Sequence, residues 1–117
     1  MLGTIVPDEI KTITSEKWAE WAVLFTNGNR GRLISIFLED DNPEGDLLVE
    51  DVELVALDYD PIGKGNTFII SHGDDESPIR HEIEEPIDLV QGQDANGLVV
   101  SLSIEDASGT ITMIKLN

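Results

Sequence analysis

The fold is decided by the stretch Leu98–Leu116, LVVSLSIEDASGTITMIKL, in which two alternating segments flank a short polar turn. Apolar side chains recur at every second position on both sides of Asp106–Thr110, which is the period of a strand that buries one face. Gly109 suits the left-handed position of a three-residue hairpin loop. Such a loop places three pairs on one buried face, namely Val100 with Leu116, Leu102 with Ile114, and Ile104 with Thr112. The stretch therefore predicts an antiparallel hairpin.

Other segments rich in Ile, Val, Leu and Phe precede this hairpin and are bounded by turn-forming residues. The predicted strands are Leu33–Leu38, Leu47–Tyr59, Thr67–Ser71, Ile79–Leu89, Leu98–Glu105 and Thr110–Leu116. The turns between them are brief, whereas parallel strands require crossovers of about a dozen residues or more. We therefore expect a mostly antiparallel sheet of about five to seven strands, with Leu33–Leu38 as an unpaired edge.

The opening segment has a helical period instead. Its apolar residues at i, i+3, i+4 and i+7 form one stripe, made of Trp18, Trp21, Ala22 and Phe25. Thr14 or Ser15 is positioned to cap the helix, and Asn27-Gly28 provides a stop. These signals predict an amphipathic helix at 14–27.

A chain of 117 residues with 40% hydrophobic residues is suited to one domain with its own core. We predict an N-terminal arm at 1–13, the helix at 14–27 and the antiparallel sheet at 31–117. The fold class is α+β, with the helix packed on a sheet that curls into a partial barrel.

Charge is the strongest compositional signal. The chain has 24 acidic residues, 7 basic residues and a formal net charge of −17, and no Lys or Arg occurs from Leu33 through Gly63. This balance opposes direct binding to nucleic acids and to anionic membranes, and it favours basic proteins or cations.

The composition also excludes several classes of site. Without cysteine there is no disulfide, thiolate nucleophile or thiolate zinc site. No cofactor is predicted, because no phosphate-binding glycine loop is present. The chain lacks an apolar run of the roughly 20 residues that span a bilayer, and Met1–Ile10 lacks a signal pattern, so a cytoplasmic location is expected.

A family resemblance rests on the order of four features along the chain. These are the Trp-bearing opening helix, Val52–Asp60, His81–Pro86 and Ser103–Thr112. Together they resemble a family of small, uncharacterised bacterial domains of unknown function, from about Ile13 onward. The resemblance implies a stand-alone small bacterial protein and supplies no activity or catalytic residues.

The acidic loop after Leu38 is the first candidate site. Its side chains follow the spacing of a calcium-binding loop, with oxygen ligands at positions 1, 3, 5 and 12 and glycine at position 6. Asp40, Asn42, Glu44 and Asp51 occupy these four positions, and Asp46 is a further candidate ligand in the same loop. Against this prediction, the flanks are predicted strands, whereas the motif is flanked by helices; a solvated acidic turn is the alternative.

A second candidate site centres on His81, which alternation places on the core-facing side of a strand. A histidine there is either a general base or ligand, or a partly buried side chain bonded to a carbonyl. With Tyr59 and Trp21 it outlines a candidate pocket between helix and sheet. His72 is expected opposite Pro78 and His81 opposite Ile69, so the two imidazoles need not meet.

The leading functional interpretation is a non-enzymatic module whose acidic surface steers a basic protein partner. Three alternatives remain: a small-ligand-binding domain or enzyme with the pocket near His81, a DNA mimic whose carboxylates copy phosphate spacing, and a calcium-binding acidic loop. Solubility alone also accounts for part of the acidity.

Overall fold

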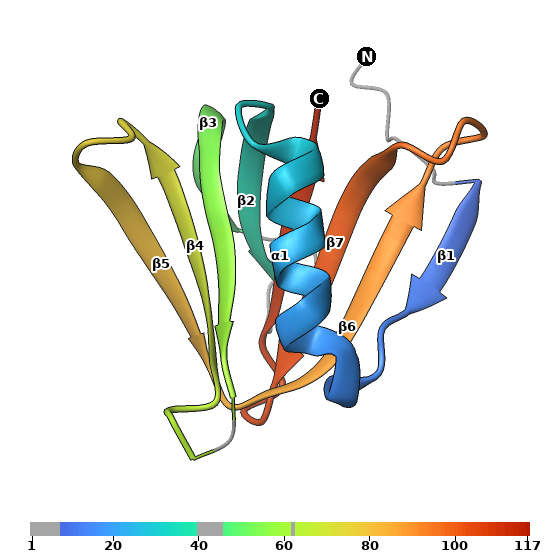
Figure 1. Ribbon diagram of the computed structural model, residues 1–117, viewed down its shortest axis with the longest axis vertical. Helices are drawn as coiled ribbons and strands as arrows, with labels where there is room; N and C mark the ends of the chain where they lie inside the picture. The colour runs from blue at the N-terminus through green and yellow to red at the C-terminus, as the bar shows by residue number, and fades with distance from the viewer. Residues whose placement is uncertain (1–7, 40–45, 62) are drawn as a thin grey trace.

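The computed structural model describes residues 8–39, 46–61 and 63–117, which form one helix and an eight-stranded antiparallel sheet (Figure 1). The elements in chain order are β1 (Glu9–Thr12), the 3₁₀ turn η1 (Ser15–Lys17), α1 (Trp18–Asn29), β2 (Leu33–Glu39), β3 (Asp46–Asp60), β4 (Thr67–Gly73), β5 (Pro78–Glu84), β6 (Pro86–Gln93), β7 (Val99–Asp106) and β8 (Ile111–Leu116). The strand order is β1-β6-β7-β8-β2-β3-β4-β5. The α+β class is confirmed, with more strands than expected.

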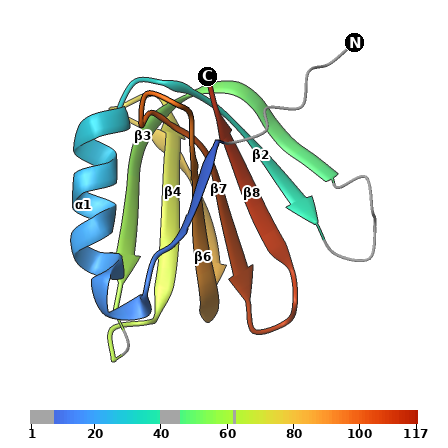
Figure 2. The same ribbon diagram turned by 90° about the vertical axis from the view of Figure 1, so that its right-hand side faces the viewer.

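Helix α1 lies against one side of the curled sheet, as the two views in Figures 1 and 2 show. It buries the stripe Trp18, Ala22, Phe25 and Asn29. The Trp18 ring contacts the rings of Tyr59 and Phe68, with centroid separations of 5.3 and 5.2 Å. Contacts of the Trp18 ring therefore hold the predicted amphipathic helix against the sheet.

The helix boundaries differ from the prediction at both ends. The first predicted turn is the 3₁₀ turn η1, with no side-chain capping bond from Thr14, and α1 begins at Trp18. Gly28 lies inside α1, which continues to Asn29, and Gly31 adopts the positive φ of 91° that ends the turn. The Gly31 N–H then donates to the carbonyl of Leu54 on β3. A tertiary bond to the sheet thus fixes the exit of the chain two residues beyond the expected stop.

Strand β3 joins the two parts of the sheet. Residues 46–53 pair with β2, and residues 54–60 pair with β4, so the two halves of one long strand have different neighbours. A register shift in the first half coincides with Asp51, whose φ is 51°, and such a bulge increases the local twist. This arrangement bends the sheet and leaves one edge of residues 54–60 facing α1.

The segment predicted as one strand, Ile79–Leu89, forms two strands, so that prediction was wrong. Strand β5 ends at Glu84, and β6 begins at Pro86. Between them Glu85 has a φ of 51°, and Pro86 has no N–H to continue a ladder. The chain therefore turns a corner at Glu85.

Two further predictions about the edges of the sheet are corrected. Part of the expected N-terminal arm is strand β1, which pairs with β6. The expected edge strand Leu33–Leu38 lies inside the sheet as β2, between β8 and β3. The two edges are β1 and β5.

The C-terminal hairpin has the predicted register. Leu102 pairs with Ile114 and Ile104 pairs with Thr112, and all four side chains are buried. Gly109 has the expected positive φ of 90°. Among the described residues, no helix has the length and apolar character required to cross a bilayer.

Candidate functional site

An open groove of about 720 Å³ lies between β5 and the β7–β8 hairpin. We call it the acidic groove. Its lining residues are Leu38, His81, Glu82, Ile83, Glu84, Glu85, Asp106, Ala107, Ser108, Thr110 and Thr112. They come from β2, β5, β7, β8 and the two corners, so the groove depends on the curl of the sheet.

Four acidic residues belong to the lining of this groove: Glu82, Glu84, Glu85 and Asp106. None of the lining residues is Lys or Arg. The ion pairs between described residues, Lys11 with Glu9 and Arg30 with Asp75, lie outside it. Uncompensated negative charge in a concave site attracts cations more strongly than scattered surface charge does.

Local hydrogen bonds hold the hairpin wall of the groove in place. One carboxylate oxygen of Asp106, Oδ1, accepts hydrogen bonds from the N–H of Ser108 at 2.9 Å, the Ser108 hydroxyl at 2.6 Å and the N–H of Thr110 at 3.2 Å. The Ala107 N–H donates to the carbonyl of Glu85 at 3.0 Å. The corner after β5 is therefore tied to the hairpin, and both residues of this bond belong to the lining of the groove.

His81 lies at the groove, and its register differs from the prediction by one residue. It pairs with Ile70, and His72 pairs with Ile79, because Gly73 and Pro78 close the β4–β5 turn. The turn thus has four residues instead of the expected five. Both imidazoles consequently face the same side of the sheet as diagonal neighbours.

Burial affects both histidines. It lowers the pKa of His81, and it lowers the pKa of His72, which the proximity of His81 lowers further. His72 is 3% exposed, and its Nδ1 atom has no hydrogen-bond partner within the described structure. The two histidines are therefore neutral near neutral pH, and the only formal charges that line the groove are those of its carboxylates.

Tyr59 does not line the acidic groove. Its hydroxyl donates to Asn66 Oδ1 at 2.6 Å, and burial raises its pKa. Its side chain lines a second depression of about 340 Å³ between α1 and strands β3–β5, together with Asp58, Asp60 and Arg80. The hydroxyl thus has a structural hydrogen bond.

Trp21 lies at a third place. Its ring stacks on Phe25 with a centroid separation of 5.0 Å, and Nε1 donates to Gln91 Oε1 at 2.9 Å. It borders a shallow depression of about 240 Å³ beside Ile13. The structure therefore does not bring His81, Tyr59 and Trp21 together around one pocket.

The predicted calcium ligands are only partly within the described structure. Asp40, Asn42 and Glu44 lie outside the described residues. Asp46 begins β3, and Asp51 Oδ1 accepts a hydrogen bond from Asn117 Nδ2 at 3.0 Å. The described residues contain no group of three or more His, Asp or Glu side chains that could hold a metal ion.

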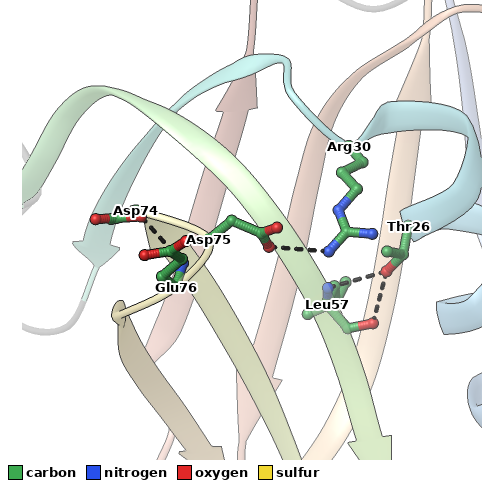
Figure 3. A network of polar contacts seen from close by, with 6 residues as sticks. All are labelled: Thr26, Arg30, Leu57, Asp74, Asp75 and Glu76. Carbon is green, nitrogen blue, oxygen red and sulfur yellow. Dashed lines mark hydrogen bonds and ion pairs between the residues drawn. The ribbon is translucent and has the colours of Figure 1, made fainter.

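A second acidic segment, at the β4–β5 turn, is arranged differently (Figure 3). Arg30, directly after α1, lies 3.1 Å from Asp75 Oδ1, and Asp74 Oδ1 accepts a hydrogen bond from the N–H of Glu76. One of the few basic side chains thus offsets one of the three acidic charges in this turn. The acidic groove has no Lys or Arg in its lining, which distinguishes it from the β4–β5 turn.

The sequence analysis singled out His81 but missed the group formed by Glu84, Glu85 and Asp106. The alternating acids at Glu82 and Glu84 are a visible signal in the sequence. Asp106 reaches them only because β6 and β7 return the chain to the end of β5. No local spacing contains that information.

No curated protein and no solved structure matches the chain. A family model, described as a family of unknown function (DUF5335), matches residues 9–117. This span contains every helix and strand described above and the whole lining of the acidic groove. The resemblance to a family of unknown function is confirmed: the chain belongs to the family DUF5335.

Proposed function

We propose that this protein is a non-enzymatic interaction module that binds a basic segment of another protein in the acidic groove. The supporting observation is the lining itself, which contains four acidic residues and no Lys or Arg. The formal net charge of −17 adds a long-range field that accelerates encounter with cationic partners.

The shape of the groove also favours a peptide over a small molecule. Its walls are an exposed strand edge and a hairpin loop, and it is open to solvent. Small-ligand sites are usually enclosed and mostly apolar. A chain segment with cationic side chains therefore fits this groove better than a compact apolar ligand does.

A direct binding measurement tests the proposal. The probe is a fluorescein-labelled peptide of seven residues in which three Lys residues alternate with four Val residues, and the readout is fluorescence anisotropy at low salt. We expect binding that weakens as NaCl rises, because salt screens exposed charges over a Debye length of about 8 Å at 0.15 M. A peptide with Gln in place of Lys serves as the neutral control.

A pair of charge-matched variants locates the site. Glu82→Gln combined with Glu84→Gln removes two carboxylates from the groove, and we expect about tenfold weaker binding of the Lys peptide. Glu16→Gln combined with Glu20→Gln makes the same change in net charge at η1 and α1, outside the groove. Equal effects of the two pairs would contradict a localised site.

The other predicted functions are separated by their own outcomes. Capture of a nucleic-acid-binding protein would favour the DNA mimic. A melting temperature that depends on calcium would favour calcium binding by the acidic loop at Asp40–Asp51. A histidine-dependent ligand, with no response to the peptide, would favour the pocket near His81. Each of these remains a prediction from the sequence.

A further inference from the structure

We propose that the basic segment binds as a ninth, antiparallel strand on the free edge of β5. This inference rests on the proposed function, because it specifies how the acidic groove holds its partner. Strand β5 ends the sheet, pairing with β4 on one side only, and the acidic groove runs beside its other side. Strand addition to an exposed edge is a common mode of peptide recognition.

Hydrogen bonds at two separate places in the sheet indicate which backbone N–H and C=O groups of β5 face outward. The Thr26 hydroxyl bonds both the N–H and the C=O of Leu57, so these groups face away from β4. Ile70 pairs with Leu57 in the antiparallel β3–β4 ladder, so the backbone N–H and C=O of Ile70 face away from β3 and toward β5. There they bond the backbone of His81, the partner of Ile70 on β5. The groups of the neighbouring residues, Arg80 and Glu82, therefore face the groove side.

The C-terminal end of β5 indicates the same alternation of inward-facing and outward-facing backbone groups. The Glu85 N–H donates to the carbonyl of Asn66 at 3.1 Å, so the backbone of Glu85 faces the preceding strand. Successive residues of a strand direct their backbone groups to opposite edges, so the N–H and C=O of Glu84 face outward. Arg80, Glu82 and Glu84 thus each present one unpaired N–H and one unpaired C=O. Outside the sheet ladders, no backbone hydrogen bond to these three residues is found within the described structure.

The side chains along this edge specify the partner's charge. Glu82 and Glu84 are exposed, and a residue directly opposite on an added strand has its Cβ about 4.5–5.5 Å away. Lys or Arg at two alternate positions would therefore meet both carboxylates. Arg80, which is also exposed, favours an acidic or polar residue at the next alternate position.

Charge argues against a second copy of this chain as the occupant. Pairing of two β5 edges brings together two molecules with a formal net charge of −17 each, and it adds the acids of one groove to those of the other. The negative electrostatic field of this chain that repels a second copy attracts a basic segment of another protein. High salt would strengthen self-pairing and weaken binding of the basic segment, so the two occupants are distinguishable.

The test uses three versions of the seven-residue Lys-Val peptide with the intact protein. One peptide is unmodified, one carries backbone N-methyl groups on its Lys residues, and one carries them on the same number of Val residues. In antiparallel addition the Lys residues opposite Glu82 and Glu84 form the hydrogen-bonded pairs, so their N–H groups are required. We expect the Lys-methylated peptide to bind at least about tenfold more weakly, and the Val-methylated peptide to bind like the unmodified one.

Amide hydrogen exchange provides the second readout. The amides of Glu82 and Glu84 should exchange rapidly in the free protein and become protected when the unmodified peptide binds. The amides of His81 and Ile83, which bond β4, should be protected in both states.

The outcomes separate this inference from the proposed function. Equal binding of all three peptides would overturn strand addition and leave the acidic module standing. Loss of binding on methylation of Val instead of Lys would overturn the antiparallel register. Absence of binding by every peptide at low salt would overturn both proposals, as would a salt-strengthened dimer that excludes the peptide.

Discussion

At the scale of single residues, Thr26 shows how one hydroxyl takes the place of a missing strand. Residues 54–60 of β3 have no neighbouring strand on the side of α1. The Thr26 Oγ1 atom donates to the carbonyl of Leu57 at 2.9 Å and accepts from its N–H at 3.0 Å (Figure 3). Backbone groups that would otherwise be unsatisfied are thus paired by the helix.

Removing that hydroxyl tests its contribution. Thr26→Val keeps the side-chain shape and leaves both backbone groups of Leu57 without this partner, so we expect the free energy of unfolding to fall by about 2 kcal/mol. Thr26→Ser retains the hydroxyl and should lose less. Urea denaturation of the three proteins measures the difference, and equal losses for Val and Ser would contradict the role of the hydrogen bonds.

His72 predicts a pH dependence of stability. Burial and the neighbouring His81 lower its pKa below the ordinary value of 6.5. Between the folded pKa and 6.5 the unfolded chain binds more protons than the folded chain, so stability at this site falls as pH falls below about 6.5. Above that range the residue is neutral in both states and has no effect.

The matched variant is His72→Leu, which removes the titrating group and its unpaired Nδ1 atom. We expect the loss of unfolding free energy between pH 7 and pH 5, measured by urea denaturation, to be smaller in the variant. An identical pH profile in the two proteins would assign the dependence to other groups, His81 among them.

At the scale of elements, the corner between β5 and β6 combines backbone strain with the site. Glu85 has a φ of 51°, a conformation that residues with a Cβ other than Asn and Asp rarely adopt. Its carbonyl also accepts the bond from Ala107 that joins the corner to the hairpin. The chain therefore tolerates an unfavourable backbone conformation at a residue that lines the groove.

Replacing Glu85 with Asn should stabilise the fold by about 0.5–1 kcal/mol, because Asn tolerates the left-handed region better. Glu84→Asn is the control, since it removes the same charge from a regular strand position. Thermal denaturation distinguishes the two variants. If both raised the melting temperature equally, relief of charge repulsion would explain the gain instead of relief of backbone strain.

At the scale of the whole molecule, net charge dominates. A formal charge of −17 on 117 residues repels itself most when the chain is compact. We expect the melting temperature to rise with NaCl from about 10 to 150 mM, over which the Debye length shrinks from about 30 to 8 Å. A melting temperature that falls with salt would instead indicate that favourable ion pairs dominate.

The sequence by itself determined the local features of the protein. The β7–β8 register and the left-handed Gly109 follow from alternation and loop length, and the stripe through Trp18 and Phe25 follows from the helical period. These features depend on neighbours a few residues apart, which a pattern can encode. The same holds for the predicted face of His81, though not for its partner.

Tertiary structure alone decided the strand order and the site. Whether Leu33–Leu38 is an edge, and whether α1 ends at residue 27 or 29, depends on pairing with β8, β3 and Leu54. The acidic groove unites Glu84 on β5 with Asp106 on β7, although β8, β2, β3 and β4 lie between these two strands in the sheet. Side-chain periodicity fixes which face a residue occupies, but long-range backbone hydrogen bonds fix which faces and edges meet.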